Sequence, residues 1–533
     1  MRWQQSVAVA TLGLALVAAA CGGDNSGSSI ATSTTAAGAT TAGSTASAGA
    51  TTTGAATPAT TAGGSSGKTS ITIGETLAPA SLDITQQSGA AVPQALLYNV
   101  YETLVSIDDS GAFQPLLAAD YKVSTDGLTY TFTLHDNLTF ANGTPITSDT
   151  VKKTFDYNKA NAKAPALIKA TFDPVTSVTA PDPKTVVVKL TQPSRNFLFN
   201  IAQTGGAIVD DASRANIATT SNGSGPFAVD SYTTNASLVL EANPKYWGTK
   251  PALQQVTFRY FADANALANA LKAGDIDIVD NLSPELFGQF ESDTATYETV
   301  NGATPGEVIL AMNNSKAPLD NVKVRQAISY AINKQDVNDI AEQGKAQLIG
   351  SHSSPIDPWY KDLSSTYPFD PDKAKELLRE AGVSNVKLTL DVIPTPYAQA
   401  SAPVIKDELA RVGIDVTLNN VQFDLWLDKV FTKADFDLTI VAHVEARDTN
   451  LYGNPDYYWR YNNAKVQDLL KQADAAVDEA KSNGLYGQVL EQINADAVND
   501  WLFLLPRLEV VKKGVTGYPK GSYSLSYNVT GIK

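Results

Sequence analysis

The stretch ADYKVSTDGLTYTFTLHDNLTFANGTPITSDTVKKTFDY, residues 119–157, decides the fold. In its first half Tyr130, Phe132 and Leu134 alternate with threonines, which is the period of a half-buried β-strand. An Asp-Gly pair and an Asn-Gly pair supply turns, because glycine adopts the backbone that tight turns need. The polar residues that begin at Thr147 then precede a helical pattern as an N-terminal capping signal. The segment therefore predicts strands, tight turns and a helix that pack together.

The same two periods recur along the rest of the chain. Alternation predicts a strand at 256–260. Helical spacing of apolar residues predicts a helix at 324–332, with Asp320 available as its cap, and another that begins at Asp370-Pro371 and closes at Gly382. Two late helices, near 463–480 and 485–500, lead into an apolar strand at 501–505. No internal repeat is present, and the mixture of elements predicts an α/β or α+β protein with more than one lobe.

The first 67 residues have a different character from the rest. Arg2 precedes an uncharged apolar run from Val7 to Ala20, which is too short to span a bilayer and favours a signal peptide at residues 1–20. The only cysteine, Cys21, follows directly in LVAAAC, which resembles the lipobox of bacterial lipoproteins. Cys21 is therefore expected to be lipidated, the alternative being an ordinary cleavage site beside a bystander cysteine. Residues 22–67, mostly Ala, Thr, Ser and Gly, are expected to form a disordered tether.

The composition narrows the classes of function that the chain can have. The 533 residues carry 40 Lys and Arg against 55 Asp and Glu, a net charge of −15, which argues against a nucleic-acid binder. A single cysteine excludes a disulfide scaffold. Of the three histidines, His135 and His352 are expected to be solvated, so that His443 alone remains as a candidate and no metal site is expected.

Five ordered blocks resemble a known family. Residues 119–157 are similar to the signature of the extracytoplasmic solute-binding proteins of ABC importers, family 5, the peptide/nickel class. The matching positions are Ser124, Asp126, Gly127, Tyr130, Phe132, Leu134, Phe140, Gly143, Pro145, Thr147, Asp149 and Val151. The further blocks are GSGPF at 223–227, NPKYWG at 243–248, PLDNVKVRQAI at 318–328 and the stretch 367–382.

The resemblance implies a two-lobed periplasmic-binding-protein-like type II fold, mixed α/β, of the large peptide-binding class. By analogy, lobe I takes 68–106, 206–303 and 500–533, an inserted subdomain takes 107–205, and lobe II takes 304–499. Ligand is expected to bind between lobes that close by a hinge motion. The implied partners are a small peptide or polar solute, an ABC permease with its ATPase, and the membrane through the lipid anchor. The protein is expected to be a monomer at the extracytoplasmic face of the cell membrane, without cofactor.

The identity of the ligand stays open, because this chain differs from the dipeptide-binding members of the family at two positions. Dipeptide-binding members carry an arginine just before Pro-Tyr, where this chain has Thr395. They also carry W-x-x-D after a central strand, where alignment places His443 and Ala446. Both charged anchors of the dipeptide mode are thus replaced at the aligned positions, although a slip of one or two residues would bring Glu445 or Asp448 into the second one.

A charged segment after a predicted buried strand, and the aromatic run that follows, supply the candidate binding residues. Glu445 and Asp448 would accept hydrogen bonds from ligand amines, and aromatic rings would stack on the ligand. For the tryptophans and the aromatic run, packing in the core is the competing interpretation. The candidate ligand-binding residues are His443, Glu445, Arg447, Asp448, Tyr458, Trp459, Trp426, Asn313 and Thr395.

Three other classes compete with a transport receptor. An enzyme is not expected, because the sequence has no HExxH, no G-x-S-x-G, no catalytic cysteine motif and no phosphate loop. A cell-surface receptor or sensor of the same fold without a transport role stays open, as does binding of nickel or a metal chelate, which would need a histidine or a chelator.

Overall fold

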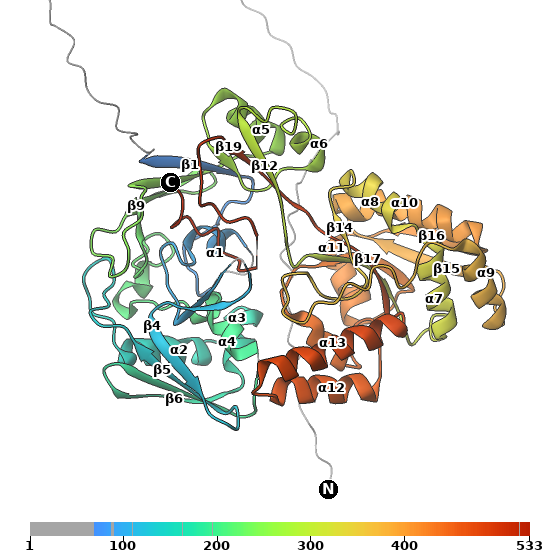
Figure 1. Ribbon diagram of the computed structural model, residues 1–533, viewed down its shortest axis with the longest axis horizontal. Helices are drawn as coiled ribbons and strands as arrows, with labels where there is room; N and C mark the ends of the chain where they lie inside the picture. The colour runs from blue at the N-terminus through green and yellow to red at the C-terminus, as the bar shows by residue number, and fades with distance from the viewer. Residues whose placement is uncertain (1–68, 87–89, 109, 163, 195, 522) are drawn as a thin grey trace, which may run out of the picture. The chain divides into compact units, whose positions relative to one another are not determined.

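The computed structural model describes residues 69–533 except 87–89, 109, 163, 195 and 522 (Figure 1). The expected signal peptide, Cys21 and the tether lie outside the described residues. In the part of the chain that is described, no helix combines the length and the apolar character needed to cross a membrane.

A seven-stranded mixed sheet has the order β12-β19-β11-β1-β10-β9-β8. β1 runs parallel to β10 and β11, and the other neighbours pair antiparallel. The strands are β1 (Ser70–Glu75), β8 (Phe227–Thr233), β9 (Ser237–Ala242), β10 (Gln255–Tyr260), β11 (Ile278–Val279), β12 (Tyr297–Gly302) and β19 (Arg507–Lys512). The associated helices are α1 (Ala91–Leu96), α5 (Ala264–Ala273) and α6 (Pro284–Phe287), with the short turn η2 (Asp211–Asn216) nearby. The short turn η1 (Thr204–Gly206) packs instead against helices of the four-stranded part described below.

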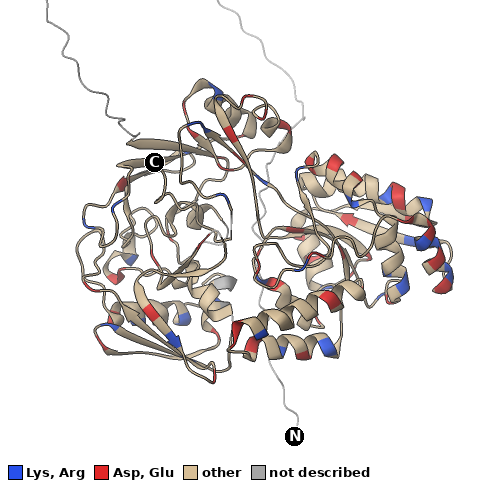
Figure 2. Ribbon diagram, in the orientation of Figure 1, with Lys and Arg blue, Asp and Glu red and all other residues tan. Residues whose placement is uncertain are grey.

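A six-stranded sheet has the order β14-β18-β13-β17-β15-β16. Its strands are β13 (Glu307–Met312), β14 (Gln347–Leu348), β15 (Val386–Val392), β16 (Ile414–Asn420), β17 (Leu438–His443) and β18 (Asn499–Leu504). Its helices are α7 (Val322–Ala331), α8 (Lys334–Glu342), α9 (Pro371–Glu380), α10 (Pro396–Arg411), α11 (Phe423–Trp426), α12 (Ala464–Ala475), α13 (Glu479–Ala495), with η3 (Leu427–Thr432) and η4 (Asp448–Gly453). Both basic and acidic residues lie along α9 (Figure 2), as on a solvated helix face.

Two smaller sheets complete the described structure. The four-stranded one has the order β4-β5-β7-β6, and the two-stranded one joins β2 to β3. Their elements are β2 (Val105–Ile107), β3 (Phe113–Pro115), β4 (Ala118–Val123), β5 (Thr129–Leu134), β6 (Val175–Asp182), β7 (Thr185–Leu190), α2 (Ser148–Ala160), α3 (Ala166–Phe172) and α4 (Asn196–Ile201). The stretch 119–157 thus forms most of β4, then β5 and α2.

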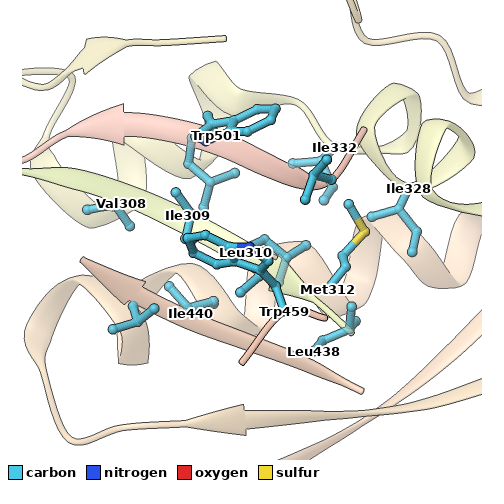
Figure 3. Packing of buried hydrophobic residues seen from close by; sticks show 14 of the residues in the cluster. Val308, Ile309, Leu310, Met312, Ile328, Ile332, Leu438, Ile440, Trp459 and Trp501 are labelled. Carbon is cyan, nitrogen blue, oxygen red and sulfur yellow. The ribbon is translucent and has the colours of Figure 1, made fainter. Parts of the chain in front are cut away.

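The six-stranded sheet is built around β13, in which every residue is buried. Ile309 and Leu310 are fully enclosed, and Trp459 and Trp501 pack beside them (Figure 3). A strand buried on both faces reads as a continuous apolar run rather than an alternating one. Because β13 pairs with both β17 and β18, it fixes where the ends of those strands meet.

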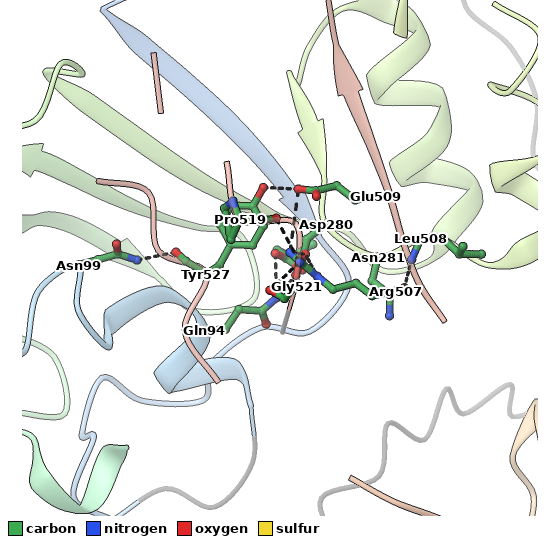
Figure 4. Close-up of polar contacts among 11 residues, drawn as sticks. Gln94, Asn99, Asp280, Asn281, Arg507, Leu508, Glu509, Pro519, Gly521 and Tyr527 are labelled. Atoms are coloured by element: carbon green, nitrogen blue, oxygen red, sulfur yellow. Dashed lines mark hydrogen bonds and ion pairs between the residues drawn. The ribbon is translucent and has the colours of Figure 1, made fainter. Parts of the chain in front are cut away.

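The core of the seven-stranded sheet contains a buried ionic cluster (Figure 4). Arg507 in β19 pairs with Asp280 and also donates to the carbonyls of Pro519, at 3.2 Å, and Gly521, at 3.1 Å. Burial raises the pKa of Glu509, two residues further on, to about 8, although the positive charge of Arg507 opposes the shift. A buried charge is tolerated where it is paired, so this cluster fixes the C-terminal segment against the sheet.

The predicted strands and helices are confirmed, with corrections at their ends. β5 and β10 show the expected alternation of buried and more exposed residues, and Thr147 caps α2 in a capping box. Asp320 was the wrong cap for α7: Asn321 accepts from the amide of Lys323 instead. The two late helices also differ from their predicted bounds, because Asp478 caps α13 and starts it at Glu479.

The chain passes between the two large sheets twice, from β12 to β13 and from β18 to β19. The passages are hydrogen-bonded to each other, since the amide of Leu505 donates to the carbonyl of Gly306 at 2.7 Å. β18 pairs within the six-stranded sheet, so the second passage follows Leu504, a few residues beyond the boundary expected at 499/500. The division into lobes and an inserted subdomain stays a prediction.

Candidate functional site

The candidate site lies where β17 ends and β13 begins. Their antiparallel register places Glu307, the first residue of β13, opposite His443, the last residue of β17. Directly paired residues on antiparallel strands project from the same face of the sheet, so these two side chains are neighbours. The loop that follows β17 carries Glu445, Arg447 and Asp448, and both His443 and Glu307 are buried at 2% exposure.

A second buried histidine joins this group. His352 is fully enclosed, which makes the expectation of a solvated histidine wrong; the loop after β14 folds inward under η4. Its Nε2 lies 2.8 Å from an Asp448 carboxylate oxygen, and His443 Nδ1 lies 3.3 Å from the other oxygen of the same carboxylate. The outer ring nitrogens face hydroxyls, His352 Nδ1 at 3.2 Å from Tyr452 and His443 Nε2 at 3.0 Å from Tyr458.

Burial and neighbouring charges shift the pKa values of the carboxyl groups in this site in opposite directions. Burial alone would favour the neutral form of Asp448, but His352 and His443 outweigh it and hold the pKa of that carboxyl well below its ordinary value. Burial raises the pKa of Glu307 well above its ordinary value, and the nearby Asp448 adds to the shift. Burial and Asp448 also raise the pKa of Glu445. An added cation would favour the charged forms of both glutamates.

Arg447 connects the loop after β17 to residues packed around the four-stranded sheet. Its Nε donates to the Tyr523 hydroxyl at 2.6 Å, and its guanidinium carbon lies 4.7 Å from the ring centre of Phe199 and 5.3 Å from that of Phe113. The residue is 8% exposed and has a φ of 63°, a left-handed backbone that costs a side-chain-bearing residue about 1–3 kcal/mol. Such strain persists only where the surrounding contacts enforce it.

Asp357 extends this connection. It accepts from the Tyr523 hydroxyl at 3.1 Å, from the Ser353 hydroxyl at 3.0 Å and from the amide of Ser354 at 3.0 Å. Burial raises the pKa of Asp357, although these donors and Arg447 work against the shift. The chain Asp357–Tyr523–Arg447 therefore ties two loops of the six-stranded part to the C-terminal segment.

The structure brings together six of the nine predicted binding residues, places a seventh at the same edge of the sheet and separates the other two. His443, Glu445, Arg447, Asp448, Tyr458 and Trp459 lie in or against the loop after β17. Thr395, the N-cap of α10, lies at the same edge of the sheet, because β15 runs parallel to β17. Trp426 and Asn313 do not join them.

Those two outliers have structural contacts of their own. Trp426 is 1% exposed and donates to the Thr439 hydroxyl at 2.9 Å. Asn313 follows the opposite end of β13 from Glu307, and its amide donates to the carbonyls of Ala434, at 2.9 Å, and Phe436, at 3.2 Å. Tyr458 and Trp459 are buried too, in an aromatic cluster with Tyr452 and Tyr457. The rings of Tyr458 and Trp459 pack against the imidazole of His443, and that of Trp459 also packs against His352.

Sequence reasoning missed Glu307, His352, Asp357 and Tyr523. Glu307 heads an apolar strand, EVILAM, and a carboxylate beside such a run is the signal that could have identified it. His352 and Asp357 lie in one serine- and proline-rich loop, and Tyr523 in the last residues of the chain, where no local pattern marks them.

A cavity of about 100 Å³ adjoins this site through Phe113, whose ring centre lies 5.3 Å from the Arg447 guanidinium carbon. Phe113, Tyr130 and Pro193 line one side of it, and Asp474 and Val477 line the other. It is bounded by the four-stranded sheet and the α12–α13 turn, and it does not include the charged residues of the loop after β17.

The two large sheets are joined by crossing segments, and charged side chains lie where separate parts of the chain meet. Both features are typical of the class of two-lobed solute-binding proteins. The chain belongs to one family of this class, since residues 112–468 match the model of the bacterial extracellular solute-binding proteins, family 5 Middle. This match confirms the predicted family, and the mixed α/β fold agrees with it.

Relatives of the chain are named for different solutes. It is 29% identical over 488 residues to the probable D,D-dipeptide-binding periplasmic protein DdpA of Escherichia coli (strain K12), covering 85% of this chain and 91% of that protein. It is 29% identical over 343 residues to the nickel-binding periplasmic protein of the same organism, covering 60% and 65%. Among solved structures, HbpA2 from Haemophilus parasuis shares the fold with a TM-score of 0.78, 22% identity, and coverage of 87% and 99%.

Proposed function

We propose that this chain is the substrate-binding lipoprotein of an ABC importer. It captures an oligopeptide or a similar polar solute at the edge formed by the loop after β17 and delivers it to a membrane permease. Cys21 anchors it by lipid at the extracytoplasmic face of the cell membrane, and residues 22–67 serve as the tether.

The observation that carries the proposal is the position of Glu445. This half-buried carboxylate follows the central strand of the six-stranded part, beside Arg447 and its contacts with the four-stranded part. Burial and the neighbouring Asp448 both raise its pKa, so a ligand amine would supply the charge that stabilises its ionised form. A peptide carries such an amine at its N-terminus. The name of the D,D-dipeptide-binding relative supports a peptide-like solute.

Solute binding is tested with a thermal-shift screen of dipeptides, tripeptides and tetrapeptides against the purified chain. A ligand present at 100 times its Kd stabilises the folded state by about 2.7 kcal/mol, so a true ligand raises the Tm measurably. Glu445→Gln is expected to weaken the binding of any hit, whereas Asp456→Asn, a change on a 90% exposed side chain, leaves it unchanged. A peptide hit that binds Glu445→Gln as tightly as the wild type would exclude the proposed amine contact.

Import and anchoring have separate tests. Deleting the gene is expected to abolish uptake of the radiolabelled hit, and unchanged uptake would favour a receptor without a transport role. Cys21→Ser is expected to stop incorporation of radiolabelled palmitate and to release the protein from the membrane fraction. Labelling that persists in Cys21→Ser would rule out the proposed anchor.

A further inference from the structure

We infer that His352, His443 and Asp448 form a site for a divalent transition-metal ion such as Zn²⁺. The inference goes beyond the proposed function, because it rests on these side chains and not on the identity of the transported solute.

The three donor groups converge on one point. Their ligand atoms, one from each residue, all lie within 4.8 Å of one another. In a tetrahedral zinc site with bonds of about 2.0–2.2 Å, neighbouring ligand atoms are about 3.3–3.6 Å apart. The Nδ1 of His443 and the Asp448 oxygen are 3.3 Å apart, and the Nε2 of His352 and the other oxygen are 2.8 Å apart. A small outward movement of one imidazole therefore suffices to admit the ion.

The buried nitrogen and oxygen atoms of this group are poorly aligned with one another. His352 Nε2 and Asp448 Oδ2 are both buried, and neither has a well-aligned hydrogen-bond partner among the described residues. The two imidazoles nevertheless attract the Asp448 carboxylate and lower its pKa. An ion placed between the three side chains would give the unaligned nitrogen and oxygen a common partner.

Glu307 lies next to this cluster without belonging to it. It is opposite His443 in the pairing of β13 with β17, and it is 2% exposed. Its Oε2 is a further buried oxygen without a hydrogen-bond partner in the described part of the chain, but the ligand atoms that lie within 4.8 Å of one another come from the two histidines and Asp448. A cation held by those three residues would favour the charged form of Glu307 beside it.

The surroundings of the imidazoles resemble the support that metal-binding histidines receive. The nitrogen of each ring that faces away from Asp448 lies near a hydroxyl, that of Tyr452 for His352 and that of Tyr458 for His443. Such outer contacts hold the ring and its proton in place. Two imidazoles with a carboxylate suit Zn²⁺ or Ni²⁺, whereas Mg²⁺ and Ca²⁺ prefer oxygen ligands alone.

The competing arrangement is an ion pair without metal. The Tyr452 hydroxyl also accepts from Asn499 at 2.9 Å and from Trp501 at 3.2 Å, so its own proton can go to His352 Nδ1. The proton of His352 would then lie on Nε2, facing Asp448. This arrangement predicts a stable protein with no affinity for zinc, so a direct measurement of zinc binding distinguishes the two alternatives.

The test uses the full chain without a polyhistidine tag, in a Cys21→Ser background, so that no other thiol or added imidazole binds metal. After EDTA treatment and dialysis, ZnSO4 is titrated calorimetrically at neutral pH, and bound zinc is counted by elemental analysis. One Zn²⁺ per chain is expected, with MgCl2 and CaCl2 giving no heat of binding. His443→Gln, His352→Gln and Asp448→Asn are each expected to weaken binding by more than about 100-fold, since even outer-contact changes cost 10–100-fold.

The chain offers a matched control. His135→Gln removes the third histidine, whose ring centre lies 5.0 Å from that of Trp247, far along the chain from the site, and should leave zinc affinity unchanged. If a ligand variant fails to fold by circular dichroism, Tyr458→Phe replaces it, with an expected loss of about 10–100-fold. Absence of stoichiometric Zn²⁺ binding, or equal losses in His135→Gln and His443→Gln, would overturn the inference. Peptide binding by the metal-free protein would still stand, so this failure is distinct from failure of the proposed function.

Discussion

Replacing Arg447 by methionine should remove a contact that joins two parts of the chain. Methionine keeps the apolar stem among the rings of Phe113 and Phe199 but removes the charge and the donor to Tyr523. A hydrogen bond from a charged donor contributes about 1.5–3 kcal/mol, and a cation–π contact about 0.5–2 kcal/mol. We therefore expect Arg447→Met to lower the free energy of unfolding by about 2–5 kcal/mol.

A double-mutant cycle isolates the hydrogen bond from the packing. Arg447→Met, Tyr523→Phe and the double variant are unfolded in urea at neutral pH, and the free energies give the coupling between the two side chains. A coupling of about 1.5–3 kcal/mol is expected for a charged donor at 2.6 Å. Arg460→Met is the control, because that guanidinium contacts only Asp456 at the surface, donating to its carbonyl at 2.8 Å and lying 3.5 Å from its carboxylate, and its loss should change stability by less than about 1 kcal/mol. A coupling near zero would refute the assigned contact.

Three further changes test the energetics of the fold. Burial raises the pKa of Glu102 from 4.5 to about 7, so the folded state binds more protons than the unfolded state between these values. Its contribution to stability therefore falls as pH rises through this window, by about 3 kcal/mol. Glu102→Gln should reduce the loss of stability between pH 4 and 8 by about that amount, whereas the exposed Glu241→Gln should not change it. Leu310→Ala, in the centre of β13, should cost about 2–5 kcal/mol in the same assay, and a loss below 1 kcal/mol would contradict its enclosure. Asp478→Ala removes the cap that accepts from Lys481 at 2.7 Å and should cost about 1 kcal/mol, with no change if α13 begins elsewhere.

Local patterns in the sequence predicted most individual elements. Alternation identified β5 and β10 because each buries one face, and Asp370-Pro371 identified the start of α9 because cap and proline act within one turn. Helix ends were less secure. Asp320 and Asn321 are both able to cap α7, and only the path of the backbone selects the second.

The candidate site could be predicted only in part, because half of it depends on pairing between distant strands. The loop with Glu445, Arg447 and Asp448 was visible as a charged segment after a buried strand. Glu307 joins it through the register of β13 against β17, which no single stretch of sequence contains. The burial of His352 also depends on residues that are distant in the sequence. Its serine-rich surroundings suggest a surface loop, whereas its burial arises because η4 and Tyr452 fold over it.

The place of β19 between β12 and β11 has a consequence for how the protein is made. A ribosome releases the chain from its N-terminus, so the seven-stranded sheet stays split until residues 507–512 have emerged. During nearly all of its synthesis the chain therefore cannot complete this sheet. A chain cut short before Arg507 would leave β11 and β12 with unpaired edges, and such edges template aggregation.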